Sequence, residues 1–375
     1  MKNNKLYIFT LLTAVSLCMT QCKQDELSEI ASETQTTKTS EAKVASQSRV
    51  AATSIFPSVV WKDNNNVAIN AHGGSVFYEN GFYHWYGSHK VAGKSESSGL
   101  SSGGIHCYRS RDLINWNDFG IVMAPNYATG STSDIAYGCR IERPHVVYNS
   151  TTQKYVCIFK LFLKGGGLNV GYNGVATSTS PTGPFTYQSK FIAASSTVGS
   201  GDFTLYKDAT NAVYLITVRK TDRAMVIDKL NNNYTAPVGS PAVMPNIAIS
   251  TEAPCVFYKS GTYHLWGSGS TGWDPNPPRY YTATNLLGAW TAQSNPCLGT
   301  NPILNLTGAA KTYGGQSTDI IKIQGVENQY IAMMDIWKPT DPINGLYIWL
   351  PFRVSNQKLS MTWVNSWNLS WFNNN

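Results

Sequence analysis

The sequence predicts an all-β protein built as a five-bladed β-propeller, with a pair of β-sandwiches as the alternative architecture. Five stretches share one layout: a polar residue, an apolar strand, a turn, and a second apolar strand that opens on a tyrosine. These tyrosines recur about every 50 to 70 residues, which leaves room for four strands in each unit. The polar residues at the five starts are His72, Glu142, Asp202, Glu252 and Gln316.

Each unit consists of short strands and turns. Runs rich in β-branched and aromatic residues, such as 74–78 and 204–206, are bounded by Gly, Asn and Asp turns. Further runs that fit outer strands occur at 105–108, 174–177, 224–227 and 280–283. No apolar pattern of helical period extends over any length.

The first 21 residues have the composition of a secretory signal. Lys2 and Lys5 precede an apolar run that is too short to span a bilayer, and the run ends at Gln21-Cys22. Cys22 at this place is typical of the acylation site of a bacterial lipoprotein, and an ordinary cleaved signal peptide is the alternative.

Residues 22–54 are rich in Ser, Thr, Ala, Gln and Lys, a composition that predicts a flexible tether. Residues 55–375 then form the predicted propeller domain. We expect a monomer outside the cytoplasm that touches a membrane only through its lipid anchor. The anchor would hold it on the outer membrane or cell surface of a Gram-negative-type bacterium, and a periplasmic protein is the alternative.

Composition argues against several other classes. The formal net charge is +7, but the basic residues are scattered, so nucleic-acid binding has little support. No CxxC motif, His/Cys cluster or EF-hand loop indicates a metal site, and no cofactor is expected. A structural Ca²⁺ or Na⁺ near the axis is left open. The domain has five cysteines, of which Cys157 and Cys255 lie in apolar runs; one disulfide is left open, and the sequence does not choose its pairing.

The five polar starts are expected to meet at one site. Glu142 lies six residues before the tyrosine that ends its strand, and the other starts have offsets of six or four. Strand side chains alternate with period two, so even offsets place all five on the face that lines the propeller axis. By the same alternation, Arg143 is expected to point to the opposite face, as a blade-packing or buried-pair residue.

Converging carboxylates beside aromatic residues indicate sugar chemistry. Glycoside hydrolysis commonly uses one carboxylic acid to protonate the leaving oxygen and a second group to activate water. Glu252 suits the acid because an apolar strand start and the nearby Asp202 would favour its protonated form. Flat aromatic faces pack against sugar rings, and each candidate platform has core packing as its alternative role: Trp85, Tyr86, Trp273, Trp337 and Trp349.

Several short motifs run in order across most of residues 56–352. They are Ala71-His72-Gly73-Gly74, Trp85-Tyr86-Gly87, Ile141-Glu142-Arg143-Pro144, Asp202-Phe203-Thr204-Leu205, Glu252-Ala253-Pro254, Thr271-Gly272-Trp273-Asp274-Pro275-Asn276, Gly315-Gln316-Ser317-Thr318 and Tyr347-Ile348-Trp349-Leu350-Pro351. Together they resemble glycoside hydrolase family 43, and best its exo-β-1,3-galactanase-like subfamily. The resemblance implies a five-bladed propeller enzyme that inverts anomeric configuration.

The resemblance also implies roles for individual residues. Glu252 would be the general acid, and Gln316 would position water or act as an unusual base through its imidic tautomer or a proton relay. Glu142 would hold substrate hydroxyls and tune the site. The other substrate contacts would be His72, Gly73, Trp85, Tyr86, Asp202, Trp273, Asp335, Trp337 and Trp349.

The chain departs from the resembled family at several positions. Most of family 43 has an Asp base on the first blade where this chain has His72, although the galactanase-like subfamily also lacks it. Subfamily members tend to have Glu where Ser88 stands, and Arg where Gly201, Thr251 and Ile336 stand. These replacements predict altered contacts with the sugar.

The function expected from the sequence is exo-acting, inverting glycoside hydrolysis that releases galactose from β-1,3-galactan-type glycans. The substrate would be an oligo- or polysaccharide and the enzyme a galactan 1,3-β-galactosidase. The alternatives within the family are an α-L-arabinofuranosidase, a β-galactofuranosidase or a β-xylosidase. A non-catalytic glycan-binding lipoprotein is the alternative from another class, because the usual Asp base is missing.

Overall fold

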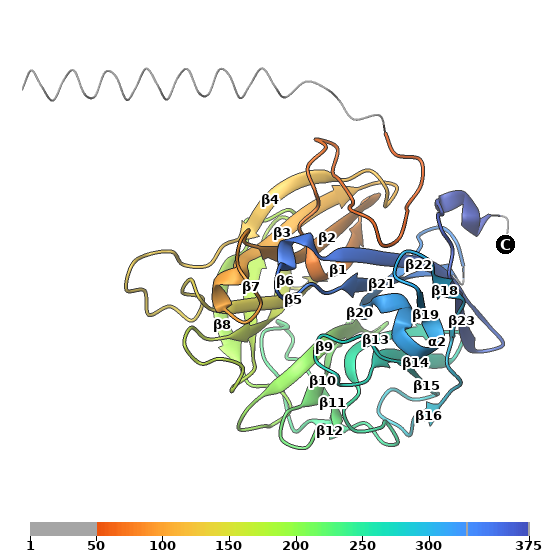
Figure 1. The fold of residues 1–375 in the computed structure, drawn as a ribbon. Helices are drawn as coiled ribbons and strands as arrows, with labels where there is room; N and C mark the ends of the chain where they lie inside the picture. Colours follow the sequence, from red (N-terminus) through yellow and green to blue (C-terminus); the bar gives the residue numbers. More distant parts are fainter. Residues whose placement is uncertain (1–50, 328, 374–375) are drawn as a thin grey trace, which may run out of the picture. The chain divides into compact units, whose positions relative to one another are not determined.

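Five antiparallel sheets stand in a ring in the computed structural model, which describes residues 51–327 and 329–373 (Figure 1). The sheets follow one another along the chain, and each is built from its innermost strand outward. This is the five-bladed β-propeller that the sequence predicts. The predicted signal peptide, the acylation site Cys22 and the tether up to residue 50 lie outside the described residues.

Four antiparallel strands form the body of each blade. The innermost strands contact one another around the ring: β1 (His72–Glu79), β5 (Arg140–Asn149), β9 (Ser200–Lys207), β13 (Glu252–Lys259) and β20 (Gln316–Lys322). The second strands are β2 (Phe82–Lys90), β6 (Lys154–Phe162), β10 (Val213–Arg219), β14 (Thr262–Ser268) and β21 (Gln329–Ile336). The third strands are β3 (Ser102–Ser110), β7 (Tyr172–Ser178), β11 (Met225–Lys229), β15 (Pro278–Ala283) and β22 (Leu346–Ser355). The outermost are β4 (Asn117–Met123), β8 (Thr186–Phe191), β12 (Ala242–Val243), β16 (Thr291–Ala292) and β23 (Lys358–Thr362).

The remaining elements are short and lie between or beyond the blades. β17 (Cys297–Leu298) adds to the fifth blade parallel to β23, and β18 (Thr300–Asn301) pairs with β19 (Leu306–Thr307). The helical turns are η1 (Gly99–Ser101), α2 (Gly308–Lys311), η2 (Thr312–Gly314), η3 (Pro342–Asn344) and η4 (Leu369–Phe372).

The tyrosines that mark the repeat face one another across each hairpin. Tyr78 on β1 lies opposite Tyr83 on β2, with ring centroids 4.7 Å apart. Tyrosine pairs occupy the same place in the second, third and fourth blades, and Lys322 lies opposite Tyr330 in the fifth. Cross-strand aromatic pairs stabilise a hairpin, so the repeat in the sequence is a repeat of hairpin register.

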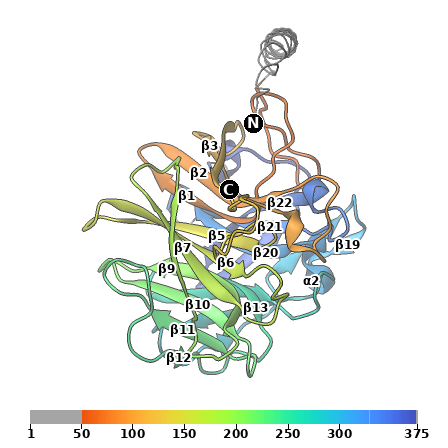
Figure 2. The same cartoon turned by 90° about the vertical axis from the view of Figure 1, so that its left-hand side faces the viewer.

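An apolar cluster is buried between each pair of neighbouring blades. Trp85 and Trp349 fill the cluster between the first and fifth blades, Tyr86 lies between the first and second, and Trp290 between the third and fourth. These clusters hold the blades face to face, so that β5, β9 and β13 lie next to one another at the centre of the ring (Figure 2). The axis itself is left for polar side chains.

Segments from the two ends of the described region meet at the fifth blade. The backbone of Ile55 and that of Trp367 exchange two hydrogen bonds, with N···O distances of 2.7 and 3.0 Å, and Ser58 N donates to Tyr347 O at 2.9 Å. The buried Trp367 ring donates from Nε1 to Trp349 O at 2.7 Å. These hydrogen bonds of Ile55, Ser58 and Trp367 tie both segments to the core between the fifth and first blades.

The five cysteines of the domain, Cys107, Cys139, Cys157, Cys255 and Cys297, are all buried and free. The sequence left one disulfide open, and none forms among these five thiols. Within the described residues, no helix combines the length and the apolar character that a membrane crossing requires.

Candidate active site

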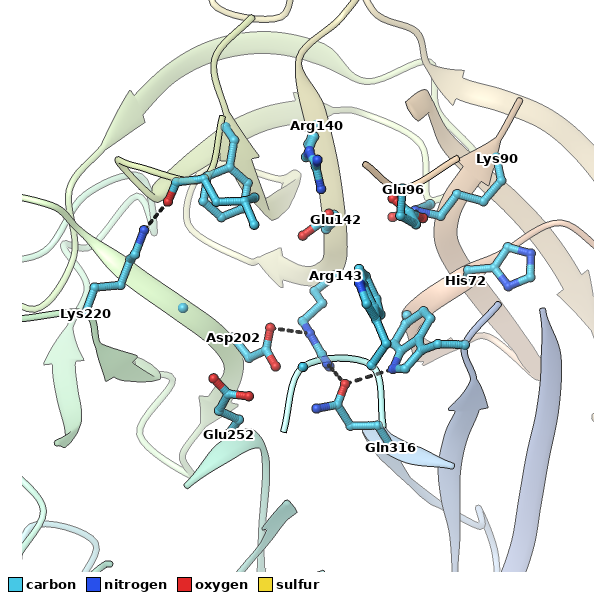
Figure 3. Close-up of a pocket in the computed structure, with 18 of the residues that line it drawn as sticks. His72, Lys90, Glu96, Arg140, Glu142, Arg143, Asp202, Lys220, Glu252 and Gln316 are labelled. Atoms are coloured by element: carbon cyan, nitrogen blue, oxygen red, sulfur yellow. Dashed lines mark hydrogen bonds and ion pairs between the residues drawn. The ribbon is translucent and has the colours of Figure 1, made fainter. Parts of the chain in front are cut away.

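A pocket of about 290 Å³ opens at the axis, where the starts of the innermost strands converge (Figure 3). Its lining residues come from two places in each blade: the start of the innermost strand and the segment at or after the end of the second strand. In the third blade, for example, β9 supplies Asp202, and the turn after β10 supplies Lys220 and Arg223. The two places coincide in space because the strands of a hairpin run in opposite directions.

The structure brings together most of the residues that the sequence singles out for the site. Those in the pocket wall are His72, Gly73, Glu142, Asp202, Glu252, Trp273, Gln316 and Trp337. Asp202 does not occupy the same register position as the other four polar starts. Glu252 pairs with Ser268 just before the bulge of its hairpin, and the third-blade residue in the same position is Ser200, which pairs with Arg219. Asp202 lies two residues further along β9.

Trp85, Tyr86 and Trp349 do not line the pocket, so the prediction that they are sugar platforms is wrong. All three are fully buried in the clusters between blades. They lie on second and third strands, whose large apolar side chains fill the gap between sheets instead of facing the axis. Core packing, their alternative role, is the one that the structure shows.

Asp335 is also buried, and it lies behind the pocket wall instead of in it. Its Oδ2 accepts a hydrogen bond from Gly73 N at 2.8 Å and lies 3.6 Å from His72 Nδ1. Asp335 therefore holds the start of β1 and orients the His72 ring, and the predicted direct contact with substrate is wrong.

A β-bulge follows the polar start of β5 and equivalent bulges occur in the other blades. In three blades the next residue has a left-handed backbone: Gly73 (φ 62°), Arg143 (φ 49°) and Ala253 (φ 49°). A bulge breaks the period-two alternation of side chains. Arg143 therefore faces the pocket with Glu142, and the expectation that it points to the opposite face is wrong.

Arg143 holds two other pocket residues in place. Its Nε forms an ion pair with Asp202 Oδ1 at 2.8 Å, and its Nη2 donates to Gln316 Oε1 at 2.9 Å. Its Nη1 donates to Ser317 O at 3.1 Å, and its guanidinium lies over the Trp337 ring. A planar fork of several N–H groups suits this role, because it can bind two partners in fixed directions.

The side-chain amide of Gln316 has a fixed orientation. Its Oε1 accepts from Arg143 Nη2 and from Trp337 Nε1, both at 2.9 Å, and its Nε2 donates to Ser268 Oγ at 3.1 Å. Arginine and the indole N–H can only donate, so the oxygen must face them. An imidic tautomer would carry a proton on that oxygen and oppose two donors. This geometry favours Gln316 as a group that positions water through its remaining N–H.

Glu252 reaches the pocket beside Asp202 (Figure 3). One of its oxygens forms an ion pair with Arg223, which also donates to Ser270 Oγ. Asp202 is itself paired with Arg143. The candidate acid thus has a cation from the turn after β10 and a carboxylate from β9 as its neighbours in the pocket.

Glu142 is the pocket carboxylate outside the ion pairs formed by Lys90, Arg143 and Arg223. Burial is the main cause that raises the pKa of Glu142, opposed by the cation of Lys90 and reinforced by the carboxylate of Glu96. A carboxyl of this kind can exchange hydrogen bonds with substrate hydroxyls in either protonation state.

A buried lysine lies opposite the pocket residue Glu142. Lys160, opposite Glu142 on β6, has an exposed fraction of 1 % and donates from Nζ to Ser200 Oγ at 3.0 Å. Burial lowers the pKa of Lys160 to about 7, although the carboxylates of Asp202 and Glu142 act in the opposite direction. Lys160 is therefore a cation close to losing its proton near neutral pH.

Two tryptophans frame the mouth of the pocket. Trp273, from the loop after β14, is 44 % exposed, and its ring lies 5.7 Å from that of Trp337 in an edge-to-face arrangement. Trp337 is fixed by its bond to Gln316, whereas Trp273 leaves much of its surface to solvent. An exposed indole at a pocket mouth is suited to stack on a sugar ring.

Five charged lining residues were missed by sequence reasoning: Lys90, Glu96, Arg140, Lys220 and Arg223. Apart from Arg140 at the start of β5, each lies at or after the end of a second strand. The charged run 219–223 after the third-blade hairpin was a usable signal, because a propeller places such segments beside the polar starts. In residues 51–327 and 329–373, no group of three or more His, Cys, Asp or Glu side chains could hold a metal ion.

The fold and the pocket define the class of this protein: a five-bladed propeller with carboxylates, an oriented amide and an exposed indole at its axis is suited to hydrolyse glycosidic bonds. The sequence model of glycosyl hydrolases family 43 matches residues 60–337. The chain therefore belongs to glycosyl hydrolase family 43 and is a glycoside hydrolase. Among curated proteins, none matches the sequence significantly.

Solved structures of family 43 are similar along most of the chain. The β-1,3-galactosidase BT0265 is 32 % identical over 85 % of this chain and 64 % of its own, with a TM-score of 0.75. The β-1,3-galactosidase BT3683 with galactodeoxynojirimycin is 31 % identical over 84 % of this chain and 100 % of its own, with a TM-score of 0.76. An exo-β-1,3-galactanase from Phanerochaete chrysosporium with galactose is 27 % identical over 84 % of this chain and 68 % of its own, with a TM-score of 0.71.

Proposed function

We propose that this chain is an exo-acting, inverting galactan 1,3-β-galactosidase that releases galactose from β-1,3-galactan-type glycans. The observation that carries the proposal is the similarity to a β-1,3-galactosidase along that enzyme's whole length, in a structure that holds a galactose-like iminosugar. The pocket supports it, because Glu252 and Gln316 line one cavity of a size suited to a single terminal sugar.

In the proposed reaction, Glu252 gives its proton to the departing glycosidic oxygen. Water held by the free N–H of Gln316 attacks the anomeric carbon as the bond to the departing oxygen breaks, and the configuration inverts. The proton that this water loses passes to solvent in the open pocket, and solvent returns a proton to Glu252. Arg143 keeps the amide oxygen of Gln316 turned away from the water. Glu142 binds hydroxyls of the terminal sugar, and the exposed Trp273 stacks on the sugar beyond it.

One observation favours a second candidate, a non-catalytic glycan-binding protein. The place of a base is taken by Gln316, whose oxygen is already occupied by two donors. An arabinofuranosidase, galactofuranosidase or xylosidase is the alternative within the family. Aryl β-galactoside, aryl α-L-arabinofuranoside and β-1,3-galactan, assayed side by side, separate these candidates, and binding of a glycan without cleavage would support the second one.

We also propose that the protein is a monomer outside the cytoplasm, anchored through a lipid on Cys22. The charged start, the apolar run and the cysteine that follows it support this placement. Replacing Cys22 with Ala should move the protein from the membrane to the soluble fraction, and a protein that stays with the membrane would refute the anchor.

Glu252→Gln tests the acid. The change removes the transferable proton and keeps the side-chain shape, so kcat on the best substrate should fall by about 10²- to 10⁴-fold. Glu79→Gln is the matched control, because Glu79 lies at the far end of β1 and does not line the pocket. Unchanged turnover by Glu252→Gln would refute the acid assignment, and a product NMR spectrum that shows retained configuration would refute the mechanism.

A further inference from the structure

A buried ion pair on the first-blade side of the pocket has no part in the reaction described above. Lys90 Nζ lies 2.5 Å from Glu96 Oε1, and the two side chains are only 5 % and 4 % exposed. Both line the pocket. A buried ion pair costs free energy of desolvation that its own attraction often does not recover. Stability alone is therefore a poor reason for placing two charges here.

The pair is built into the wall with fixed backbone on both sides. The side-chain amide of Asn70 exchanges hydrogen bonds with Lys90 N and Lys90 O, at 2.8 and 2.9 Å. Glu96 N donates to Pro339 O at 2.7 Å, which joins the loop after β2 to the loop after β21. Ser101 Oγ donates to Glu96 Oε2 at 3.1 Å. The Glu96 carboxylate is thus held in one position, as a recognition group requires.

His72 lies at the same end of the pocket as Lys90 and Glu96 (Figure 3). Its ring is 2 % exposed and packs behind the wall, stacked on Tyr347 with its Nδ1 3.6 Å from Asp335. The imidazole therefore supports the wall from behind, and the charged groups that this end of the pocket offers to a ligand are those of Glu96 and Lys90.

A short side chain at the same wall leaves room for a ligand. Ser88 lies near the end of β2, and its Oγ donates to Ile141 O at 2.8 Å. Ser88 is short and lines the pocket, so it leaves space in front of β2. Glu96 brings a carboxylate to this wall from a loop instead of from the strand.

We propose that Glu96, held by Lys90, is a specificity-determining residue that accepts hydrogen bonds from hydroxyls of the terminal sugar at the first-blade end of the pocket. Its carboxylate would distinguish sugars that differ in the direction of one hydroxyl. A site built to pair a hydroxyl rejects the epimer that leaves its polar groups unpaired. The inference rests on the proposed function for the identity of the sugar. The binding of sugar hydroxyls by Glu96 does not depend on which sugar the enzyme cleaves.

The test compares wild type, Glu96→Gln and Lys90→Met, with Asp134→Asn as the matched control. Asp134 also forms an ion pair with a lysine, Lys190, but on the surface and away from the pocket. The probes are galactodeoxynojirimycin and its gluco epimer for binding, and 4-nitrophenyl β-galactoside for turnover. Thermal melting of each variant reports the fold, and a Lys90→Met/Glu96→Gln double variant replaces any single variant that does not fold.

We expect Glu96→Gln to raise the dissociation constant of galactodeoxynojirimycin at least tenfold and to bring the galacto-to-gluco preference close to one. KM for the galactoside should rise more than kcat falls, and Asp134→Asn should behave like wild type. A lower melting temperature with an unchanged preference between the epimers would overturn the inference.

Failure of the proposed function would look different. If wild type cleaves the aryl arabinofuranoside and not the galactoside, the proposed sugar is wrong. The same KM comparison on the arabinofuranoside then tests Glu96, and a KM equal to that of wild type in Glu96→Gln would overturn its role on that substrate as well.

Discussion

At the scale of single residues, the site depends on which atoms already have partners. Gln316 is the clearest case, because both its oxygen and one of its N–H groups are engaged by neighbours that fix the amide. The group of Gln316 that remains free for substrate or water is its second N–H, which is a hydrogen-bond donor. The chemistry expected of an amide in place of a carboxylate follows from this: it can orient a nucleophile, and it is a weak proton acceptor.

Gln316→Glu and Gln316→Ala separate positioning from proton acceptance. Glutamate keeps an oxygen toward Arg143 and Trp337 and can accept from Ser268, so the fold should be kept. We expect Gln316→Ala to lose about 100-fold in kcat, roughly 2.7 kcal/mol of transition-state stabilisation. Gln316→Glu should keep more activity than Gln316→Ala and gain a new acidic limb in its pH–rate profile. Equal kcat and equal pH profiles in the two variants would contradict a positioning role for the amide.

At the scale of elements, the strands were predictable from the sequence and the bulges were not. The tyrosine pairs lie on regular parts of the hairpins, where period two holds, and they gave the repeat its register. The bulges break that period just where the polar residues meet, and nothing in the residue types marks them: Gly73, Arg143 and Ala253 share the same left-handed backbone. The period-two expectation therefore fails for Arg143, which lines the pocket together with its neighbour Glu142.

Lys160 on β6 makes the stability of the second blade depend on pH. Burial lowers its pKa from 10.5 to about 7, so below pH 7 the folded protein carries a buried charge at full cost. Between about pH 7 and 10.5 the unfolded chain binds more protons at this residue than the folded one. The contribution of Lys160 to stability therefore rises with pH in that window and is lost as pH falls back through it.

Lys160→Met should remove this dependence. Methionine fills a similar volume without a charge, so the variant should be more stable than wild type at pH 6, by on the order of a few kcal/mol before the lost contacts with Ser200, Glu142 and Asp202 are subtracted. The difference should shrink steadily from pH 7 to 10. Urea unfolding of both proteins at pH 6, 8 and 10 measures it, and a difference that stays constant with pH would contradict the shifted pKa.

At the scale of the whole molecule, the ring decides which residues of the sequence become neighbours. The pattern of hairpins was sufficient to predict five blades and to bring the polar starts to the axis, because both depend on local repeats. The charged wall residues after the second strands, Lys90, Glu96, Lys220 and Arg223, depend on how blades are placed around the axis. The prediction that Trp85 and Trp349 are sugar platforms fails for the same reason. Both side chains pack between the first and fifth blades, and no local pattern in the sequence describes which blades are neighbours.

Contacts between the first and last described segments add to the closure of the ring, and their contribution can be tested at Trp367. This side chain is 3 % exposed, packs between the fifth and first blades, and bridges to Ile55 through its backbone. Trp367→Ala should lower the free energy of unfolding by about 3 to 5 kcal/mol, because a cavity opens in the core that joins the two blades. Trp363→Ala is the control, since the Trp363 indole N–H bonds to Asn365 at the surface and the side chain is only partly buried. The pocket lies at the axis, so kcat at 25 °C should stay close to that of wild type in both variants. Equal urea midpoints for Trp367→Ala and Trp363→Ala would show that the packing of Trp367 does not hold the first and fifth blades together.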